Sequence, residues 1–272
     1  MPSDSAYLLV AHGSRDPRFQ IALERLATLV HQQLIVAQSE SQKSVEPASV
    51  LAASAPLSAP AAVAPLPPGA STVPLVGTAC LEVVPQALHI QIQEFCQQAI
   101  SYGNPQVKIL PLFLLPGVHV MDDIPTEITI AQQALGSKLA LDLRAYLGSH
   151  PGVIRLLINQ VSTLPSQVWI LVSHGSRRQG GNDLVEAIAA ELGAVTAYWS
   201  VPPDLTTQVT DLIRVGYRQI AVLPYFLFSG GITDAIAQTM ADLSGQFPEV
   251  EFQLGSPLGA NAGLANLILD LA

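Results

Sequence analysis

Residues 9–15, Leu-Val-Ala-His-Gly-Ser-Arg, return almost unchanged as residues 171–177, Leu-Val-Ser-His-Gly-Ser-Arg. Two shorter segments recur in the same order, residues 110–114 at 223–227 and residues 147–149 at 254–256. Such self-similarity indicates a duplicated structural unit. Matching segments of the two copies are separated by fewer residues after an Ala/Pro-rich stretch of the first copy than before it. We therefore interpret that stretch as an insertion in the first copy. We expect two domains, 1–160 and 161–272.

Each copy of the repeat has the pattern of a strand, a sharp turn and a helix. Residues 6–11 are apolar and stop at a histidine, and the next apolar residues fall at helical spacing: Phe19, Leu23, Leu26 and Val30. Further strands are predicted at 73–79, 107–115 and 140–143, with helices from residue 85, at 122–134 and at 151–159. This alternation is typical of a parallel sheet with crossover helices. We predict an α/β fold of two similar domains, each a parallel sheet flanked by helices, with a cleft between them.

Composition disfavours several partners. The 272 residues carry 12 Lys and Arg against 21 Asp and Glu, a net charge of −9. Nucleic-acid-binding proteins normally show a basic stripe, so no nucleic acid is expected. The two cysteines, Cys80 and Cys96, lack CxxC spacing and favour a reducing cytoplasm. The first ten residues do not resemble a signal peptide.

Residues 45–70 are rich in Ala, Pro and Ser. A membrane-spanning helix needs about 20 strongly apolar residues and tolerates few prolines. We expect this segment to be a disordered insertion and assign it no chemistry, and we expect a soluble protein with no membrane contact.

A histidine ends the first strand of each half. Ligands of open α/β sheets bind beyond the carboxyl ends of strands, which is where His12 and His174 are expected. The glycine permits a tight turn, and the serine and helix N-terminus suit an anion. The alternative is a structural turn with a capping serine and a histidine that only hydrogen-bonds.

Two more ligand-type residues follow strands of the first half. Glu82 ends the second strand and His119 follows the third. If these strands are parallel neighbours, His12, Glu82 and His119 project from one edge of the sheet. Two imidazoles and a carboxylate suit Fe²⁺, Co²⁺, Ni²⁺ or Zn²⁺. The alternatives are a favourable charge near a helix N-terminus for Glu82 and an exposed loop position for His119.

The second half lacks the combination of two histidines and a glutamate at its strand ends. Aligning the repeats places Ser200 opposite Glu82 and Ile232 opposite His119, so only His174 remains. A metal site would therefore belong to the first half, and the second half would supply the opposite wall of the cleft.

Several of these motifs together resemble the sirohydrochlorin chelatases. They are the paired His-Gly-Ser strand ends, Glu82 before Val-Val-Pro, and Pro-Leu-Phe-Leu-Leu-Pro-Gly-Val-His at 111–119 followed by Asp-Asp-Ile-Pro at 122–125. The resemblance covers both halves, apart from the insertion, and is to the long, two-domain form of the class II, ATP-independent enzymes. It implies chelatase-like domains and insertion of Fe²⁺ or Co²⁺ into sirohydrochlorin for siroheme or cobalamin. It assigns catalytic and metal-binding roles to His12, Glu82 and His119.

Metal insertion removes two pyrrole protons, which a histidine can accept. No nucleotide is expected, since the GxxxxGK[ST] loop is absent, and no Fe–S cluster is expected, since the chain ends in Leu-Ile-Leu-Asp-Leu-Ala without a Cys-rich tail. The carboxylates of a polyanionic tetrapyrrole require local donors. Our candidates are Ser14, Arg15, Arg177 and Arg178. Ordinary surface solvation is the alternative for the arginines.

Three other functions compete with this interpretation. A non-catalytic carrier of tetrapyrrole or metal would use the same cleft. A histidine phosphatase would place an arginine before the His-Gly pair, where this chain has Ala11 and Ser173. A purely structural repeat protein would not need ligand-type residues at its strand ends.

Overall fold

The computed structural model describes residues 5–43 and 74–272; the predicted insertion, residues 45–70, lies outside the described residues. The first half contains four strands and the helices between them. Its elements are β1 (Ser5–Ala11), α1 (Pro17–Lys43), β2 (Val76–Cys80), α2 (Leu88–Ser101), β3 (Gln106–Pro111), the π-helical turn η1 (His119–Asp123), α3 (Ile124–Leu135), β4 (Ala140–Leu143), the 3₁₀ turn η2 (Leu147–Ser149) and α4 (Gly152–Thr163).

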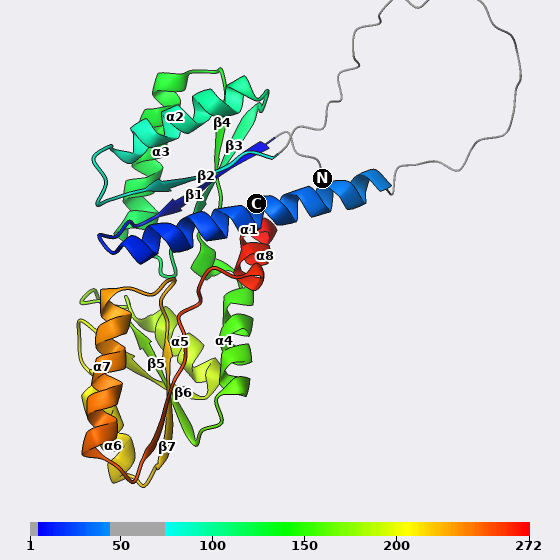
Figure 1. The fold of residues 1–272 in the computed structure, drawn as a ribbon. Helices are drawn as coiled ribbons and strands as arrows, with labels where there is room; N and C mark the ends of the chain where they lie inside the picture. Colours follow the sequence, from blue (N-terminus) through cyan, green and yellow to red (C-terminus); the bar gives the residue numbers. More distant parts are fainter. Residues whose placement is uncertain (1–4, 44–73) are drawn as a thin grey trace, which may run out of the picture.

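The second half repeats the same order of strands and helices. Its elements are β5 (Val168–Ser173), α5 (Asp183–Leu192), β6 (Ala194–Tyr198), α6 (Leu205–Arg214), β7 (Gln219–Pro224), α7 (Gly231–Gln246), β8 (Glu251–Leu254) and α8 (Ala262–Leu271). The sheets are parallel and four-stranded, in the orders β2-β1-β3-β4 and β6-β5-β7-β8. The predicted α/β architecture of two similar halves is confirmed (Figure 1).

The central strands explain the apolar runs of the sequence. Tyr7 of β1 pairs with Val76 on one side and Lys108 on the other. Every residue of β1 after Ser5 is buried, because helices cover both faces of the sheet. The carboxyl ends of β1, β2 and β3 therefore meet at one edge, as the site prediction requires.

Each sheet has one face covered by helices of its own half. In the first half α2 and α3 cover that face with side chains such as Ile92 and Ile128. In the second half α6 and α7 do the same with Val209 and Ile236.

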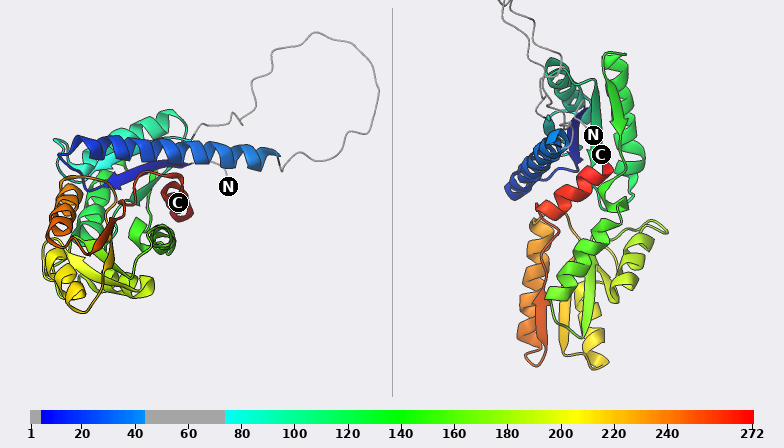
Figure 2. Two further views of the ribbon diagram at one scale, coloured as in Figure 1. Left: turned by 60° about the horizontal axis from the view of Figure 1, so that its bottom comes forward. Right: turned by 90° about the vertical axis from the view of Figure 1, so that its right-hand side faces the viewer.

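The opposite face of each sheet is covered with the help of a helix from the other half of the sequence. Helix α8, at the end of the second half, packs against α1 of the first half, whereas α4, at the end of the first half, packs against α5 and β7 (Figure 2). One apolar core consequently runs through both halves, joining Leu9 and Leu26 to Val153, Leu171 and Leu264. The domain boundary expected at residue 160 falls inside α4.

An ion-pair network also joins the halves at the surface. The Arg18 guanidinium, at the start of α1, donates hydrogen bonds to Asp16 and to Asp234 in the first turn of α7. Both carboxylates have a lowered pKa, chiefly because of these hydrogen bonds. The network lies where α1 and α7 approach each other.

Several element boundaries depart from the sequence prediction. Helix α2 begins at Leu88 rather than at residue 85, and α4 ends at Thr163 rather than at residue 159. Strand β2 begins at Val76 rather than at residue 73. Strand β3 ends at Pro111 rather than at residue 115, and its pairing with β1 ends there, with Val10 opposite Pro111. The helix expected from residue 122 is preceded by η1, which begins at His119. Among the described residues, no helix is both long enough and apolar enough to span a bilayer.

Candidate metal centre

Backbone pairing beyond the strand ends brings Glu82 to His12. The N–H of Leu81 donates to the carbonyl of Ala11, and the N–H of Glu82 donates to the carbonyl of His12, both at 2.9 Å. The ladder between β1 and β2 thus continues past both strands. Glu82 is held level with His12 by the backbone, before any side-chain contact is made.

Gly13 permits this close approach. Its φ of +101° lies in the region that L side chains rarely adopt, and a Cβ atom there would lie 2.1 Å from the carbonyl oxygen of Glu82. Val83, directly after Glu82, also has a positive φ of 65°. Backbone held in such conformations is frequently found at functional sites. The turn after β1 therefore requires glycine for a steric reason.

His119 reaches the same edge from η1. The N–H of Ile124 donates to the carbonyl of His119, which closes the wide π-helical turn. Within the turn, His119 Nδ1 lies 2.7 Å from Asp123 Oδ2. Short π-helical turns are rare and occur often at functional sites.

The three predicted residues form one cluster. His12, Glu82 and His119 each offer a ligand atom, and these atoms lie within 4.8 Å of one another. His12 Nε2 is 3.8 Å from Glu82 Oε2, and the two imidazole rings meet edge to face at 4.9 Å between centroids. The side chains are 47%, 52% and 34% exposed. The donor set is accessible from solvent and suits a borderline divalent ion.

Phe113 contacts both histidines. Its ring centroid lies 6.3 Å from that of His12 and 6.2 Å from that of His119. Phe113 follows β3 and is half-buried against the core formed by α2 and α3. An aromatic ring beside the imidazoles limits the directions in which they can turn.

The second half repeats the backbone of this site without its ligands. The N–H of Ser200 donates to the carbonyl of His174, as Glu82 does to His12. This bond places Ser200 opposite Glu82, as the repeat alignment predicts. Ile232 lies at the start of α7, the position equivalent to η1. Among the described residues, the one metal-ligand cluster found lies in the first half.

A cavity of about 500 Å³ lies between the halves beside this cluster. Gly117 and Met121, which flank His119 in the sequence, line it from the first half. The second half contributes the loop after β5 and the start of α5: Ser176, Arg178, Gln179, Gly180, Gly181 and Leu184. The cleft predicted between the halves thus has one wall from each.

Of the four predicted substrate-binding residues, one lines the cavity between the halves. Arg178 lines the cavity. The hydroxyl of Ser14 accepts a hydrogen bond from the N–H of Asp16 at 3.1 Å, in the turn before α1. Arg15 and Arg177 are exposed and are not among the described residues that line the cavity.

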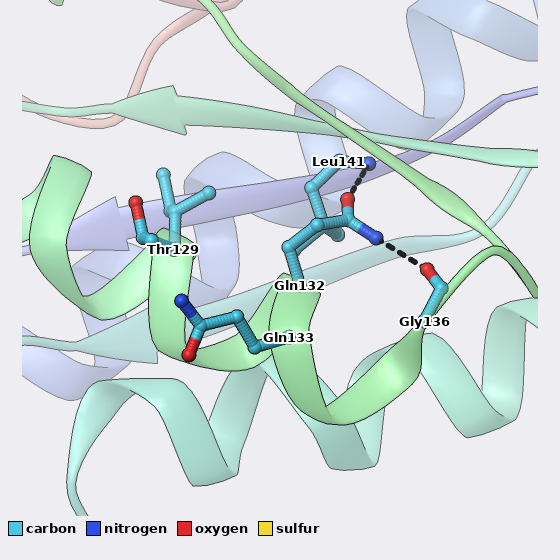
Figure 3. Close-up of a pocket in the computed structure, with 6 residues that line it drawn as sticks. Thr129, Gln132, Gln133, Gly136 and Leu141 are labelled. Carbon is cyan, nitrogen blue, oxygen red and sulfur yellow. Dashed lines mark hydrogen bonds between the residues drawn. The ribbon is translucent and has the colours of Figure 1, made fainter.

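Two further hollows lie on the first half. One, of about 390 Å³, is lined by Glu82, Asp122, Asp123 and Glu127 and approaches the cluster from the side of α2. The other, of about 410 Å³, lies at the far end of α3 (Figure 3). There the side-chain amide of Gln132 donates to the carbonyl of Gly136 and accepts the N–H of Leu141. None of the described residues that line this hollow has a titratable side chain.

The cysteines stand apart from the metal cluster. Cys80 and Cys96 are both buried and free. Burial raises the pKa of both thiols, that of Cys96 to about 12. Since thiolates rather than thiols bind metals, these buried thiols are weaker candidate ligands than the histidines and the carboxylate.

Comparison with known proteins matches both halves to one family. The sequence model of the CbiX family matches residues 71–164 and again residues 168–272, well over half of the chain. The chain belongs to the CbiX family. The two matches also agree with the internal repeat, since residues 71–164 lie within the first half and residues 168–272 cover the second.

Proteins similar in sequence to this chain carry the names of chelatases. The sirohydrochlorin ferrochelatase of Priestia megaterium is 25% identical over 216 residues, which cover 70% of this chain and 80% of the relative. The sirohydrochlorin cobaltochelatase of the same organism is 23% identical over 190 residues, covering 64% and 61% of the two chains. The cobalt complex of the sirohydrochlorin chelatase SirB from Bacillus subtilis subspecies spizizenii has the same fold, with a TM-score of 0.64, 18% identity, and coverage of 98% of this CbiX chain and 93% of SirB.

Sequence reasoning missed Asp123. It stands four residues after His119, and residues at that spacing lie on one face of a helix. The sequence predicts a helix that begins at residue 122, so His119 is expected in the loop before it. The contact between His119 and Asp123 is therefore not predicted. The π-helical turn that starts at His119 is what joins the two side chains.

Proposed function

We propose that this CbiX-family chain inserts a divalent metal ion, Fe²⁺ or Co²⁺, into sirohydrochlorin without ATP, in siroheme or cobalamin synthesis. The observation that carries this proposal is the cluster of His12, Glu82 and His119 beside a cavity between the halves. The relatives named above, a ferrochelatase and a cobaltochelatase, support the substrate and both metals.

The reaction exchanges one dication for two protons. The metal ion arrives as a substrate and is held by imidazole nitrogens of His12 and His119 and the carboxylate of Glu82. The ion then leaves these ligands for the four ring nitrogens, and two pyrrole N–H protons depart. The histidines accept these protons and Glu82 relays them to solvent. Charge balances without an oxidant, a nucleotide or an Fe–S cluster.

Imidazole and carboxylate ligands suit a metal ion that binds and is then released. Imidazole and carboxylate bind Fe²⁺ and Co²⁺ alike, so the supply of each ion in the cell decides the product. The partial exposure of all three side chains leaves room for the macrocycle to approach. Buried free thiols fit a reducing cytoplasm, where we place the protein.

The carboxylates of sirohydrochlorin require positive partners in a protein of net charge −9. Arg178 lines the cavity, and its guanidinium suits bidentate carboxylate binding. Ser14, Arg15 and Arg177 lie on the turns after β1 and β5 and are proposed as further contacts.

The test is anaerobic absorbance spectroscopy of sirohydrochlorin with Fe²⁺ or Co²⁺. We expect multiple turnovers with wild type and a loss of about 10²-fold or more with His119→Ala, because both metal binding and proton transfer are affected. His174→Ala is the matched control, since it removes the histidine of the half without other ligands. It is expected to keep most of the activity.

Two results would contradict this assignment. If neither ion is inserted faster than in the protein-free reaction, the chain is not a chelatase, and tight tetrapyrrole binding without turnover would identify a carrier. If His174→Ala is inactive while His119→Ala is active, the site lies in the second half.

A further inference from the structure

Asp123 is the group in closest polar contact with the proposed metal ligands. Its Oδ2 lies 2.7 Å from Nδ1 of His119, within the same π-helical turn. The two side chains are 43% and 34% exposed. A short hydrogen bond to an ionised acceptor is roughly twice as strong as one between neutral groups.

This contact determines which nitrogen of His119 is free. A neutral imidazole donates from one ring nitrogen and offers a lone pair on the other. Because Nδ1 donates to the Asp123 carboxylate, the lone pair belongs to Nε2. A carboxylate behind a metal-bound histidine fixes the ring orientation and strengthens the ligand.

Among the described residues, His12 has no carboxylate at hydrogen-bonding distance from Nδ1. Its Nδ1 lies 3.3 Å from the carbonyl oxygen of the adjacent Gly13, which is long for a hydrogen bond. Its Nε2 lies 3.8 Å from Glu82. The two histidines therefore differ at Nδ1, since a carboxylate at 2.7 Å holds the ring of His119, whereas Nδ1 of His12 faces a backbone carbonyl at 3.3 Å.

We propose that Asp123 is a positioning residue of the metal centre: it holds the His119 ring so that Nε2 faces the ion shared with His12 and Glu82. This inference rests on the proposed function, in which these three residues bind the ion. Asp123 itself touches neither ion nor tetrapyrrole and acts through His119.

A second histidine–carboxylate pair provides an internal comparison. Glu127 Oε2 lies 2.8 Å from His89 Nδ1 and also accepts the backbone N–H of His89 at 2.7 Å. The second bond ties Glu127 to the first turn of α2, which is a structural role. Glu127 lines the same hollow as Asp123, so Glu127→Gln removes a negative charge from the same surroundings.

The experiment measures Co²⁺ binding to the tetrapyrrole-free protein by calorimetry, together with the visible absorption spectrum of bound Co²⁺, which reports the ligand geometry. For Asp123→Ala we expect about 10- to 100-fold weaker Co²⁺ binding and an altered spectrum. Asp123→Asn keeps an oxygen that can accept from Nδ1–H, so it should restore part of the affinity and the wild-type spectrum. Glu127→Gln should bind Co²⁺ as wild type does.

The outcomes separate this inference from the proposed function. If His119→Ala weakens Co²⁺ binding and both Asp123 variants bind it normally, Asp123 has no positioning role and the metal centre stands. If His119→Ala also binds Co²⁺ normally, the metal centre does not lie at His12, Glu82 and His119. If Glu127→Gln is as weak as Asp123→Ala, the general charge of the hollow is responsible and the inference fails. Circular dichroism confirms folding, and the nearly isosteric Asp123→Asn keeps the test decisive if Asp123→Ala does not fold.

Discussion

Gly13 shows how the absence of a Cβ atom allows a proposed metal ligand, Glu82, to lie level with His12. The site needs Glu82 level with His12, and the carbonyl of Glu82 occupies the space where any Cβ of residue 13 would lie. Gly175 holds the equivalent position in the second half, with a φ of +79° and a Cβ that would lie 2.7 Å from the Cβ of Tyr198. The same backbone requirement therefore occurs once beside the proposed metal centre and once in the half that lacks its other ligands.

We expect Gly13→Ala and Gly175→Ala to differ in one measurement. Both should lower the free energy of unfolding by about 1–3 kcal/mol or more, because both force a positive φ on alanine. Only Gly13→Ala should also weaken Co²⁺ binding, because it displaces Glu82 from His12. Thermal denaturation and Co²⁺ titration of both variants check this. Normal Co²⁺ affinity in a folded Gly13→Ala protein would contradict the role assigned to this glycine.

At this scale, the sequence predicted the three clustered residues because each follows the carboxyl end of a strand. Such ends meet at one edge whatever the details of the helices. Asp123 could not be placed in the same way, since its contact with His119 depends on where a helix begins. Helix starts are fixed by backbone hydrogen bonds, here that of Ile124 to the carbonyl of His119, which the apolar periodicity does not record.

Between elements, the Arg18 network connects α1 to α7. Hydrogen bonds from Arg18 lower the pKa of Asp16 and Asp234 below their ordinary value of 3.8. A carboxyl group with a depressed pKa in the folded state stabilises the fold above its unfolded pKa, and this contribution is lost as the pH falls through the folded value. The network therefore stabilises the junction at neutral pH and not in strong acid.

Arg18→Ala should lower the thermal midpoint at about pH 7 and have a smaller effect at about pH 2, because the stabilisation is lost as the pH falls through the lowered pKa of the two carboxyl groups. High salt should also reduce the difference at neutral pH, because the groups are exposed and screened. Melting curves of wild type and variant at both pH values test this. An equal difference at both would show that packing of the Arg18 side chain, rather than its charge, is what matters.

The alternation of strands and helices was predictable because each element carries its own apolar period. The partner of each helix was not. Val153 and Leu157 of α4 mark an apolar face, but nothing in their spacing shows that this face covers the sheet of the other half. Periodicity identifies a buried face, whereas its partner depends on the path of the connecting loops.

For the molecule as a whole, the shared core predicts that both halves unfold together. Ile92 is fully buried in the part of the core formed by α2 and α3, while both tryptophans, Trp169 and Trp199, belong to the second half. Ile92→Ala removes buried apolar volume worth about 2–5 kcal/mol. The midpoint of tryptophan fluorescence should shift as far as that of circular dichroism.

Denaturant titration followed by both signals tests this coupling. Coincident curves for the wild type and for the variant are expected of a single cooperative unit. An unmoved fluorescence transition, with part of the dichroism lost earlier, would show that the halves unfold separately.

The exchange of α4 and α8 also bears on how such a chain arises. Two identical single-half chains that traded their last helices would form a symmetric, domain-swapped dimer with two copies of every site. Joining the copies end to end makes one set of ligands redundant, but each half still depends on the other for the helix that closes it. Ser200 and Ile232 fit this history. On this view the ligands of one copy can be lost, whereas the copy itself is kept because its last helix closes the other half.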